Sequence, residues 1–227
     1  MTSVTPSDRI VVTGLGYVGL PLAVALVGKA DVTGLDIDRG RIEELRAGYD
    51  RTREVDGDRL RDSGLKLTSE ADECAGADVY IVTVPTPVDS ANRPDLRPLL
   101  GATETVAKLL DPARKPIVVY ESTVYPGVTE DLCGPRLEQI SGLKRGRDFF
   151  LGYSPERINP GDREHSVDRI VKVVAGENEQ VAERLEALYG KVTSAGTFRA
   201  KSIKAAEAEK GIENAQRDIN IAFMDGI

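Results

Sequence analysis

Ile10-Val11-Val12-Thr13-Gly14-Leu15-Gly16-Tyr17-Val18-Gly19 is the stretch of sequence that decides the fold. An apolar run breaks into G-x-G-x-x-G and then continues as a helical pattern, which predicts a strand, a tight turn and a helix. Gly14 permits the turn, Gly16 lets the backbone approach a pyrophosphate, and Gly19 lets helix and strand pack closely. We therefore expect a side chain at any of the three glycines to collide. The free N–H groups and the positive dipole end of the helix would face the phosphates of a dinucleotide.

A second predicted strand, Val32–Asp36, ends on a carboxylate about 20 residues after the glycines, the position that binds a ribose 2′-hydroxyl. Because a carboxylate repels a 2′-phosphate, NAD is favoured over NADP. Arg41, in the next predicted helix, could reach a 2′-phosphate, but we favour a solvated helix residue. A chance glycine turn is the alternative to the whole interpretation. The strand before, the helix after and the acid at the right distance argue against chance.

The length and composition of the chain fit one substantial α/β domain with the beginning of a second. The chain has 227 residues, of which 41% are hydrophobic, and a net charge of −7. This charge, without a basic stripe and interleaved aromatics, argues against nucleic-acid binding. No apolar run reaches the roughly 20 residues that span a bilayer. The first nine residues are polar and lack the apolar core of a signal peptide, so we expect no membrane association and a cytoplasmic location.

The few residues with metal or redox chemistry show no pattern of a metal site. Cys74 and Cys133 form neither a disulfide framework nor a spaced ligand set, and both are interpreted as ordinary, partly buried thiols. The single histidine, His165, lies in a polar segment without a cysteine or histidine companion. We therefore expect no metal.

Strand and helix patterns alternate along the chain, which predicts right-handed crossovers and a mainly parallel sheet. The expected strands after the first two are residues 65–68, 77–84, 116–120, 149–153, 170–174 and 191–194. The expected helices after the first are residues 39–47, 58–62, a brief one capped by Ser69, 99–110, one opened by Pro126 and Gly127, and 178–189.

Two of these strands deliver residues to the edge where an open parallel sheet binds its ligands, outside the carboxyl ends of the strands. Strand 77–84 runs into Pro85-Thr86-Pro87, a rigid turn that could line a crevice or simply end the strand. Strand 116–120 delivers Glu121-Ser122-Thr123-Val124, whose hydroxyls could donate to a phosphate, a sugar or a water. They could equally cap the following helix.

From about Arg199 to Met224 a helical pattern is interrupted only by Gly211. At about 1.5 Å per residue, this helix would be longer than a single doubly wound domain needs. The sequence therefore predicts a Rossmann-like doubly wound, mainly parallel α/β domain over residues 1–198. It also predicts a long connecting α-helix over residues 199–227 that begins a second domain.

Five motifs follow one another along the chain. They are GLGYVGLP (14–21), VPTP (84–87), ESTV (121–124), SPERINPG (154–161) and the pair Lys210 and Asn214. This combination, from about Arg9 to the last residues, resembles the UDP-glucose/GDP-mannose dehydrogenase family. Within it the chain looks most like the UDP-N-acetylhexosamine 6-dehydrogenases of bacterial capsule and O-antigen synthesis.

The resemblance implies an activity and a cofactor. Members of the family oxidise the C6 alcohol of a UDP-sugar to a carboxylate with two NAD, without releasing the aldehyde, and the long helix belongs to the core of a homodimer. The residues that would bind NAD, or lie next to it, are Gly14, Gly16, Tyr17, Val18, Gly19, Asp36, Arg41, Pro85, Thr86, Ser122 and Thr123.

The resemblance also implies catalytic residues. Glu156 would contact substrate or support acid–base steps, Thr123 and Asn214 would position a water, and Lys210 would stabilise the oxyanion. Alcohol oxidation needs these residue types, a base for the hydroxyl proton and a positive group beside the developing alkoxide. Lys210 and Asn214 are four apart on one helical face, although without the resemblance a solvated surface would be the simpler interpretation.

The chain departs from the family pattern in three respects, one of which is that the domain expected to close over the UDP moiety is absent. The family's second oxidation uses a glycine-flanked cysteine beyond the long helix, which neither Cys74 nor Cys133 matches. Pro160 stands four positions after Glu156, where UDP-glucose dehydrogenases carry a second glutamate. We therefore expect a truncated N-terminal portion that binds NAD but does not complete the oxidation alone. The alternatives are a non-catalytic NAD-binding or assembly module, and a β-hydroxyacid or 6-phosphogluconate-type dehydrogenase.

Overall fold

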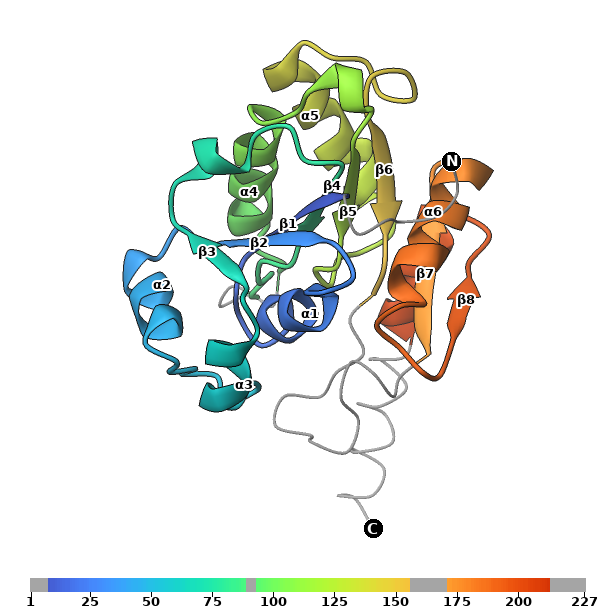
Figure 1. Cartoon of the computed structure of the whole chain (residues 1–227). Coiled ribbons are helices and arrows are strands. Elements are labelled where there is room, and N and C mark those ends of the chain that lie inside the picture. Colours follow the sequence, from blue (N-terminus) through green and yellow to red (C-terminus); the bar gives the residue numbers. More distant parts are fainter. Residues whose placement is uncertain (1–7, 89–92, 156–170, 213–227) are drawn as a thin grey trace.

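The computed structural model describes residues 8–88, 93–155 and 171–212, and its strands form one eight-stranded sheet (Figure 1). The order across the sheet is β3-β2-β1-β4-β5-β6-β7-β8. The strands are β1 Arg9–Thr13, β2 Asp31–Leu35, β3 Lys66–Thr68, β4 Val79–Val82, β5 Ile117–Tyr120, β6 Phe150–Tyr153, β7 Lys172–Gly176 and β8 Thr197–Arg199. The strand order reverses between β1 and β4, which is the switch point where doubly wound folds bind ligands.

Helices cover both faces of the sheet. They are α1 Gly19–Leu26, α2 Arg39–Arg46, α3 Gly57–Asp62, α4 Arg97–Ala107, α5 Gly134–Ser141 and α6 Glu179–Tyr189. Short 3₁₀ helices span Ala71–Cys74 and Pro112–Arg114, a π-helix spans Val128–Cys133, and residues 203–212 are helical.

Successive strand residues alternate between two cores because side chains on a strand point to opposite faces. Ile10 and Val12 of β1 pack in one core with α1 and α6, whereas Val11 packs in the other with α4 and α5. Burial on both faces explains why β4 and β5 are uninterrupted apolar runs. The predicted mainly parallel, doubly wound α/β fold is confirmed.

Among the strands of the described residues, β6 and β7 form the one antiparallel pair, toward the far side of the sheet. β8 then pairs parallel with β7. Because β7 runs antiparallel beside β6, β7 and α6 lie against the half of the sheet that carries β5 and β6. As a result, Lys172 at the start of β7 comes close to the residues that follow β5.

Three local predictions were wrong. Residues 191–194 form a turn, because the N–H groups of Val192 and Thr193 bond to the carbonyl of Tyr189 at the end of α6. The last strand is β8 instead, so the helix predicted from Arg199 starts at residue 203 and is described to residue 212. The short helix after β3 is a 3₁₀ helix with Glu70, not Ser69, at its N-cap.

None of the helices in the described residues is both long enough and apolar enough to cross a bilayer.

Candidate cofactor site

The glycine turn joins β1 to α1 at the carboxyl edge of the sheet. Gly14 has φ +93°, a left-handed conformation, and its N–H donates to the carbonyl of Leu35 at 2.8 Å. A Cβ on Gly19 would lie 1.9 Å from the carbonyl oxygen of Gly14, so helix and turn pack too closely for any side chain. A Cβ on Gly16 would meet nothing within 4 Å. The collision expected at Gly16 is therefore absent within the protein, and the space above it is open to a ligand.

The start of α1 has no side-chain cap. Val18, at the N-cap, is buried and contributes no side-chain hydrogen bond to the first turn. The side chain of Tyr17 is 41% exposed and lies at the rim of the crevice. A helix start whose N–H groups are not capped by a side chain is suited to an anion such as a pyrophosphate.

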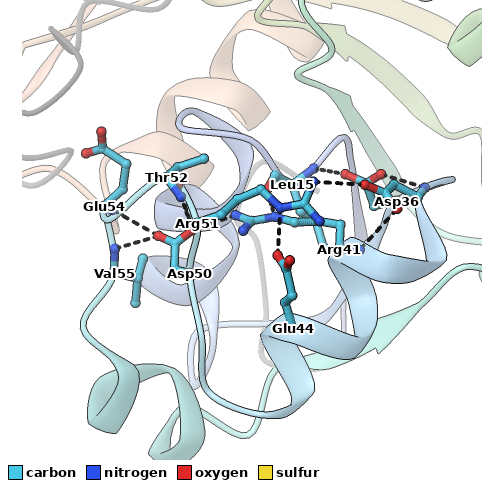
Figure 2. Close-up of polar contacts among 10 residues, drawn as sticks. Leu15, Asp36, Arg41, Glu44, Asp50, Arg51, Thr52, Glu54 and Val55 are labelled. Atoms are coloured by element: carbon cyan, nitrogen blue, oxygen red, sulfur yellow. Dashed lines mark hydrogen bonds and ion pairs between the residues drawn. The ribbon is translucent and has the colours of Figure 1, made fainter.

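Asp36, directly after β2, is held in place by two backbone N–H groups. Its carboxylate accepts a hydrogen bond from Leu15 N at 2.8 Å (Figure 2). It accepts a second from Asp38 N at 2.9 Å. Each carboxylate oxygen can accept a further hydrogen bond. The acid therefore stiffens the glycine turn and retains acceptor capacity for a ribose hydroxyl, the role predicted for it.

Arg41 is buried, which corrects its interpretation as a solvated helix residue. Its Nε donates to the carbonyl of Leu15 at 2.9 Å, and its Nη2 pairs with Asp50 at 2.6 Å (Figure 2). Among the described residues, its Nη1 has no hydrogen-bond partner. Asp50 also accepts hydrogen bonds from residues 52, 54 and 55. The guanidinium thus fastens the glycine turn to the 50–55 loop.

On the other side of the turn lies a cavity of about 340 Å³. Three segments line it, the glycine turn and the residues that follow β4 and β5. The lining residues are Gly16, Tyr17, Val18, Thr83, Val84, Pro85, Thr86, Pro87, Glu121, Ser122 and Thr123. The structure therefore brings three of the sequence motifs, far apart in the chain, to one crevice at the switch point.

Hydroxyl groups join the two segments that follow β4 and β5. The Ser122 hydroxyl donates to Val84 O at 2.6 Å, and the Thr86 hydroxyl donates to Thr123 O at 2.6 Å. Because these protons are directed at protein carbonyls, both hydroxyls can face a cofactor only as acceptors. Thr83, which sequence reasoning missed, donates to Gly14 O at 2.6 Å and fixes the glycine turn.

A buried ionic cluster at the wall of this cavity was also missed. The carboxylate of Glu121 pairs with Lys172 Nζ at 2.7 Å and accepts a hydrogen bond from the hydroxyl of Tyr189. The ammonium of Lys172 lies 5.2 Å from the centre of the Tyr189 ring. A lysine in the apolar run 170–174 was the available signal, since a buried ammonium needs a partner.

The helix of residues 203–212 presents Lys210, whose side chain is buried rather than solvated. One turn earlier, the buried carboxylate of Glu207 accepts hydrogen bonds from Gly127 N at 2.6 Å and Thr129 N at 2.9 Å. This contact ties the lysine's helix to the segment that follows Thr123. The predicted catalytic residues Glu156 and Asn214 lie outside the described residues.

Neither cysteine has the environment of a reactive thiol. Cys74 and Cys133 are both free and buried. Burial raises the pKa of each thiol to about 11. Since the thiolate is the nucleophile, both side chains behave as small apolar residues at neutral pH. The described residues also contain no cluster of three acidic, histidine or cysteine side chains that could hold a metal ion.

These features fit a dinucleotide. The open space above Gly16 and the start of α1, which no side chain caps, suit phosphates. Asp36 suits a ribose. Fold and crevice together define a Rossmann-type dinucleotide-binding domain.

Comparison with known proteins identifies the family. The sequence model of the UDP-glucose/GDP-mannose dehydrogenase family, NAD binding domain, matches residues 8–193. The chain belongs to this family and carries its NAD-binding domain, which confirms the resemblance drawn from the sequence and the prediction of NAD as cofactor.

Individual relatives agree with the family assignment. The chain is 54% identical to Protein CapL of Staphylococcus aureus and 53% identical to UDP-N-acetyl-D-glucosamine 6-dehydrogenase of Pseudomonas aeruginosa. Both alignments cover 96% of this chain and 51% of the relative. The structure of UDP-D-ManNAc dehydrogenase from Pyrococcus horikoshii superposes with a TM-score of 0.86 at 35% identity, covering 95% of this chain and 52% of that one. The chain thus spans about half the length of the relatives it matches.

Proposed function

We propose that this chain is the NAD-binding part of a UDP-N-acetylhexosamine 6-dehydrogenase, which oxidises the sugar C6 alcohol to the uronic acid. The observation that carries the proposal is the crevice in which the glycine turn, Pro85–Pro87 and Glu121–Thr123 meet at the switch point. The relatives of this chain support a UDP-N-acetylhexosamine as the substrate class. Two named UDP-N-acetyl-D-glucosamine 6-dehydrogenases are 53% and 49% identical, against 36% for a UDP-N-acetyl-D-mannosamine dehydrogenase, which favours the gluco sugar.

Residues on the two sides of the glycine turn would bind different parts of NAD. Asp36 would accept hydrogen bonds from the adenosine ribose, and the start of α1 would hold the pyrophosphate. When bound, NAD supplies the acceptor for the hydride that leaves the alcohol carbon. Pro85, Thr86, Ser122 and Thr123 would then shape the space in which that transfer takes place.

Lys210 is proposed to stabilise the developing alkoxide. A buried ammonium interacts more strongly with an oxyanion than a solvated one does, because little water screens it. Its helix is tied through Glu207 to the segment that follows Thr123. Thr123 and Asn214 would position a water, and Glu156 would contact the substrate or support proton transfer. These four roles stay predictions.

The second oxidation is not expected of this chain. In the family it needs a nucleophilic cysteine, whereas both thiols here are buried with a pKa of about 11. We therefore expect no steady production of uronic acid by this chain. The domain division at residue 198, the homodimer of the whole protein, its cytoplasmic location and a place in surface-polysaccharide synthesis also stay predictions.

Two measurements test the proposal. Calorimetry should show NAD binding more tightly than NADP, because Asp36 repels a 2′-phosphate. With protein in excess over UDP-N-acetylglucosamine, absorbance at 340 nm should show one round of NADH formation without sustained turnover. Binding of NAD with no NADH would favour the non-catalytic module, and NADH formed from β-hydroxyacids instead would favour the other dehydrogenase class. Steady uronic acid production would contradict the role assigned to the cysteines.

A further inference from the structure

Glu207, on the helix of residues 203–212, is a buried carboxylate that no step of the proposed reaction uses. It is 0% exposed, and its two oxygens accept hydrogen bonds from Gly127 N at 2.6 Å and Thr129 N at 2.9 Å. Hydrogen bonds to an ionised acceptor are stronger than those between neutral groups. The carboxylate therefore fastens its helix to the segment that follows β5.

The two N–H groups bound by Glu207 lie at the start of another helix. The π-helix Val128–Cys133 continues directly into α5, and Gly127 is its N-cap. Because a glycine has no side chain with which to bond the free N–H groups of a first turn, this helix needs a cap from elsewhere. Glu207 supplies it from a different helix. The carboxylate also interacts favourably with the positive end of the helix dipole.

Glu207 lies on the face of its helix that packs against the domain. The buried residues of the helix are Ile203, Ala206, Glu207 and Lys210. Their spacing of i, i+3, i+4 and i+7 forms one stripe along an α-helix. Ile203 and Ala206 pack in the core that also contains Val124. Lys210 is the last member of the stripe, one turn beyond Glu207, so its position on the domain depends on how the stripe is anchored.

The contact of Glu207 is more specific than the other contacts of this helix. Burial of Ile203 and Ala206 is non-directional, so it determines which face is covered more than where the helix lies along its axis. Two hydrogen bonds to fixed backbone groups have a narrow range of distance and angle. A second link between the same two elements, the ion pair of Lys204 and Asp131, is exposed and contributes little.

We propose that Glu207 is a positioning residue, which holds Lys210 in place relative to the segment that lines the cofactor crevice. Thr123 lines that crevice, and Gly127, four positions later, is bound by the carboxylate. A shift of the helix would move the ammonium away from the developing alkoxide, and small misplacements of a catalytic group cost much rate. This inference rests on the proposed function, in which Lys210 stabilises the alkoxide, and adds to it a residue that acts through that lysine.

The position of Lys210 can be measured without the reaction. An amine-acylating reagent followed by mass spectrometry reports how fast each lysine is labelled. In the unaltered protein, the buried Lys210 should be labelled about tenfold more slowly than the exposed Lys201. Glu207→Gln keeps the shape of the side chain but presents only one oxygen to the two N–H groups. In this variant, labelling of Lys210 should become about tenfold faster, with Lys201 unchanged. The matched control is Lys204→Met, which breaks the exposed pair with Asp131 and should leave Lys210 protected.

The reaction gives a second measurement. With protein in excess over UDP-N-acetylglucosamine, Glu207→Gln should form NADH about tenfold more slowly than the unaltered protein. The dissociation constant of NAD, measured by calorimetry, should change by no more than about twofold, because the glycine turn and Asp36 are untouched. Lys204→Met should change neither quantity. A loss of rate at constant affinity separates positioning from a general loss of structure, which would weaken both.

The outcomes separate this inference from the proposed function. Unchanged labelling of Lys210 in folded Glu207→Gln overturns the role of Glu207 and leaves the proposed function intact. Faster labelling with an unchanged rate of NADH formation overturns it as well, and so does a loss of NAD affinity as large as the loss of rate. Lys210 labelled as fast as Lys201 in the unaltered protein overturns it without any variant. No NADH from the unaltered protein overturns the proposed oxidation and this inference together.

A second variant tests the same contact from its other side. Circular dichroism shows whether Glu207→Gln is folded, and if it is not, Thr129→Pro takes its place. That substitution removes one of the two N–H donors in the first turn of a helix, where proline is tolerated. It should change the labelling of Lys210 and the rate of NADH formation in the same directions, and the same contrary results count against the proposal.

Discussion

Two buried ion pairs lie on opposite sides of the glycine turn, and they differ in what they join. Arg41 and Asp50 are 2.6 Å apart, and Lys172 and Glu121 are 2.7 Å apart. The first pair connects residues nine positions apart, and the second connects residues 51 positions apart. The first therefore shapes one local segment, whereas the second joins the segment after β5 to β7, which are brought near each other only by the folded sheet, with β6 between them.

The surroundings of the two acids explain the difference. Asp50 accepts hydrogen bonds from the backbone of residues 52, 54 and 55 in addition to Arg41, so it organises a loop (Figure 2). The carboxylate of Glu121 accepts hydrogen bonds from Lys172 and Tyr189, and the residue lines a cavity. The comparison teaches that one buried pair organises a single loop, while the other joins distant parts of the chain at the wall of the cavity.

The largest expected effect breaks the first pair. Asp50→Ala would leave the Arg41 guanidinium buried without its partner and would remove the acceptor for several backbone donors. We expect a loss of about 3–5 kcal/mol in the free energy of unfolding, measured with urea. The control is Asp58→Ala, which breaks an exposed pair with Arg61 and should cost about 1 kcal/mol or less. Equal losses in the two variants would contradict a structural role for Asp50.

The glycine turn between the two pairs allows ligand binding and stability to be separated. Gly16→Ala adds a methyl group into open space, so stability should be kept within about 1 kcal/mol. Affinity for NAD should fall about 100-fold, because the methyl group would occupy the pyrophosphate position. Gly19→Ala would instead destabilise the fold, since its Cβ overlaps Gly14 O. Calorimetry and urea unfolding of both variants distinguish the two effects, and full NAD affinity in Gly16→Ala would be inconsistent with this phosphate site.

Acid should weaken the adenosine-side pair. Burial raises the pKa of Asp50, but hydrogen bonds from Thr52, Arg41 and Val55 outweigh it, so the pKa lies below its ordinary value. A lowered pKa in the folded state means that this stabilisation is complete above about pH 4, the unfolded value, and is lost as pH falls through the folded pKa. Asp50→Asn should therefore show a shallower decline of unfolding free energy as the pH falls below about 4. A decline as steep as that of the unaltered chain would contradict this assignment.

The smallest expected effect concerns the second pair. Glu121→Gln/Lys172→Met removes both charges at similar volume, and such replacements are often neutral for stability. We expect the free energy of unfolding to stay within about 1 kcal/mol, in contrast to the loss in Asp50→Ala. A loss of several kcal/mol would show that the two pairs are alike in serving structure.

The sequence predicted the parts of the site that depend on local pattern. The glycine turn, the acid after β2 and the proline turn after β4 each follow a strand and mark the carboxyl edge of a parallel sheet. The side-chain partners depend on tertiary contacts instead. Arg41 appeared solvated because its helix is rich in charge, and its burial follows from Asp50 in a loop without regular pattern.

The ion pair between Glu121 and Lys172 could not be predicted from the sequence either. It depends on the antiparallel pairing of β6 and β7, and neither apolar pattern reveals the direction in which two strands run. The lysine within an apolar run indicated that a partner exists. It did not indicate which acid, since several acids precede it in the chain.

The burial of both cysteines has a practical consequence for experiments on this protein. Thiol-directed dyes react with thiolates, and neither Cys74 nor Cys133 offers one at neutral pH. A cysteine introduced at an exposed position such as Tyr125, two residues after Thr123, would therefore take up the label selectively. Such a variant can thus carry a single fluorophore in the segment that follows β5 without prior removal of its native thiols.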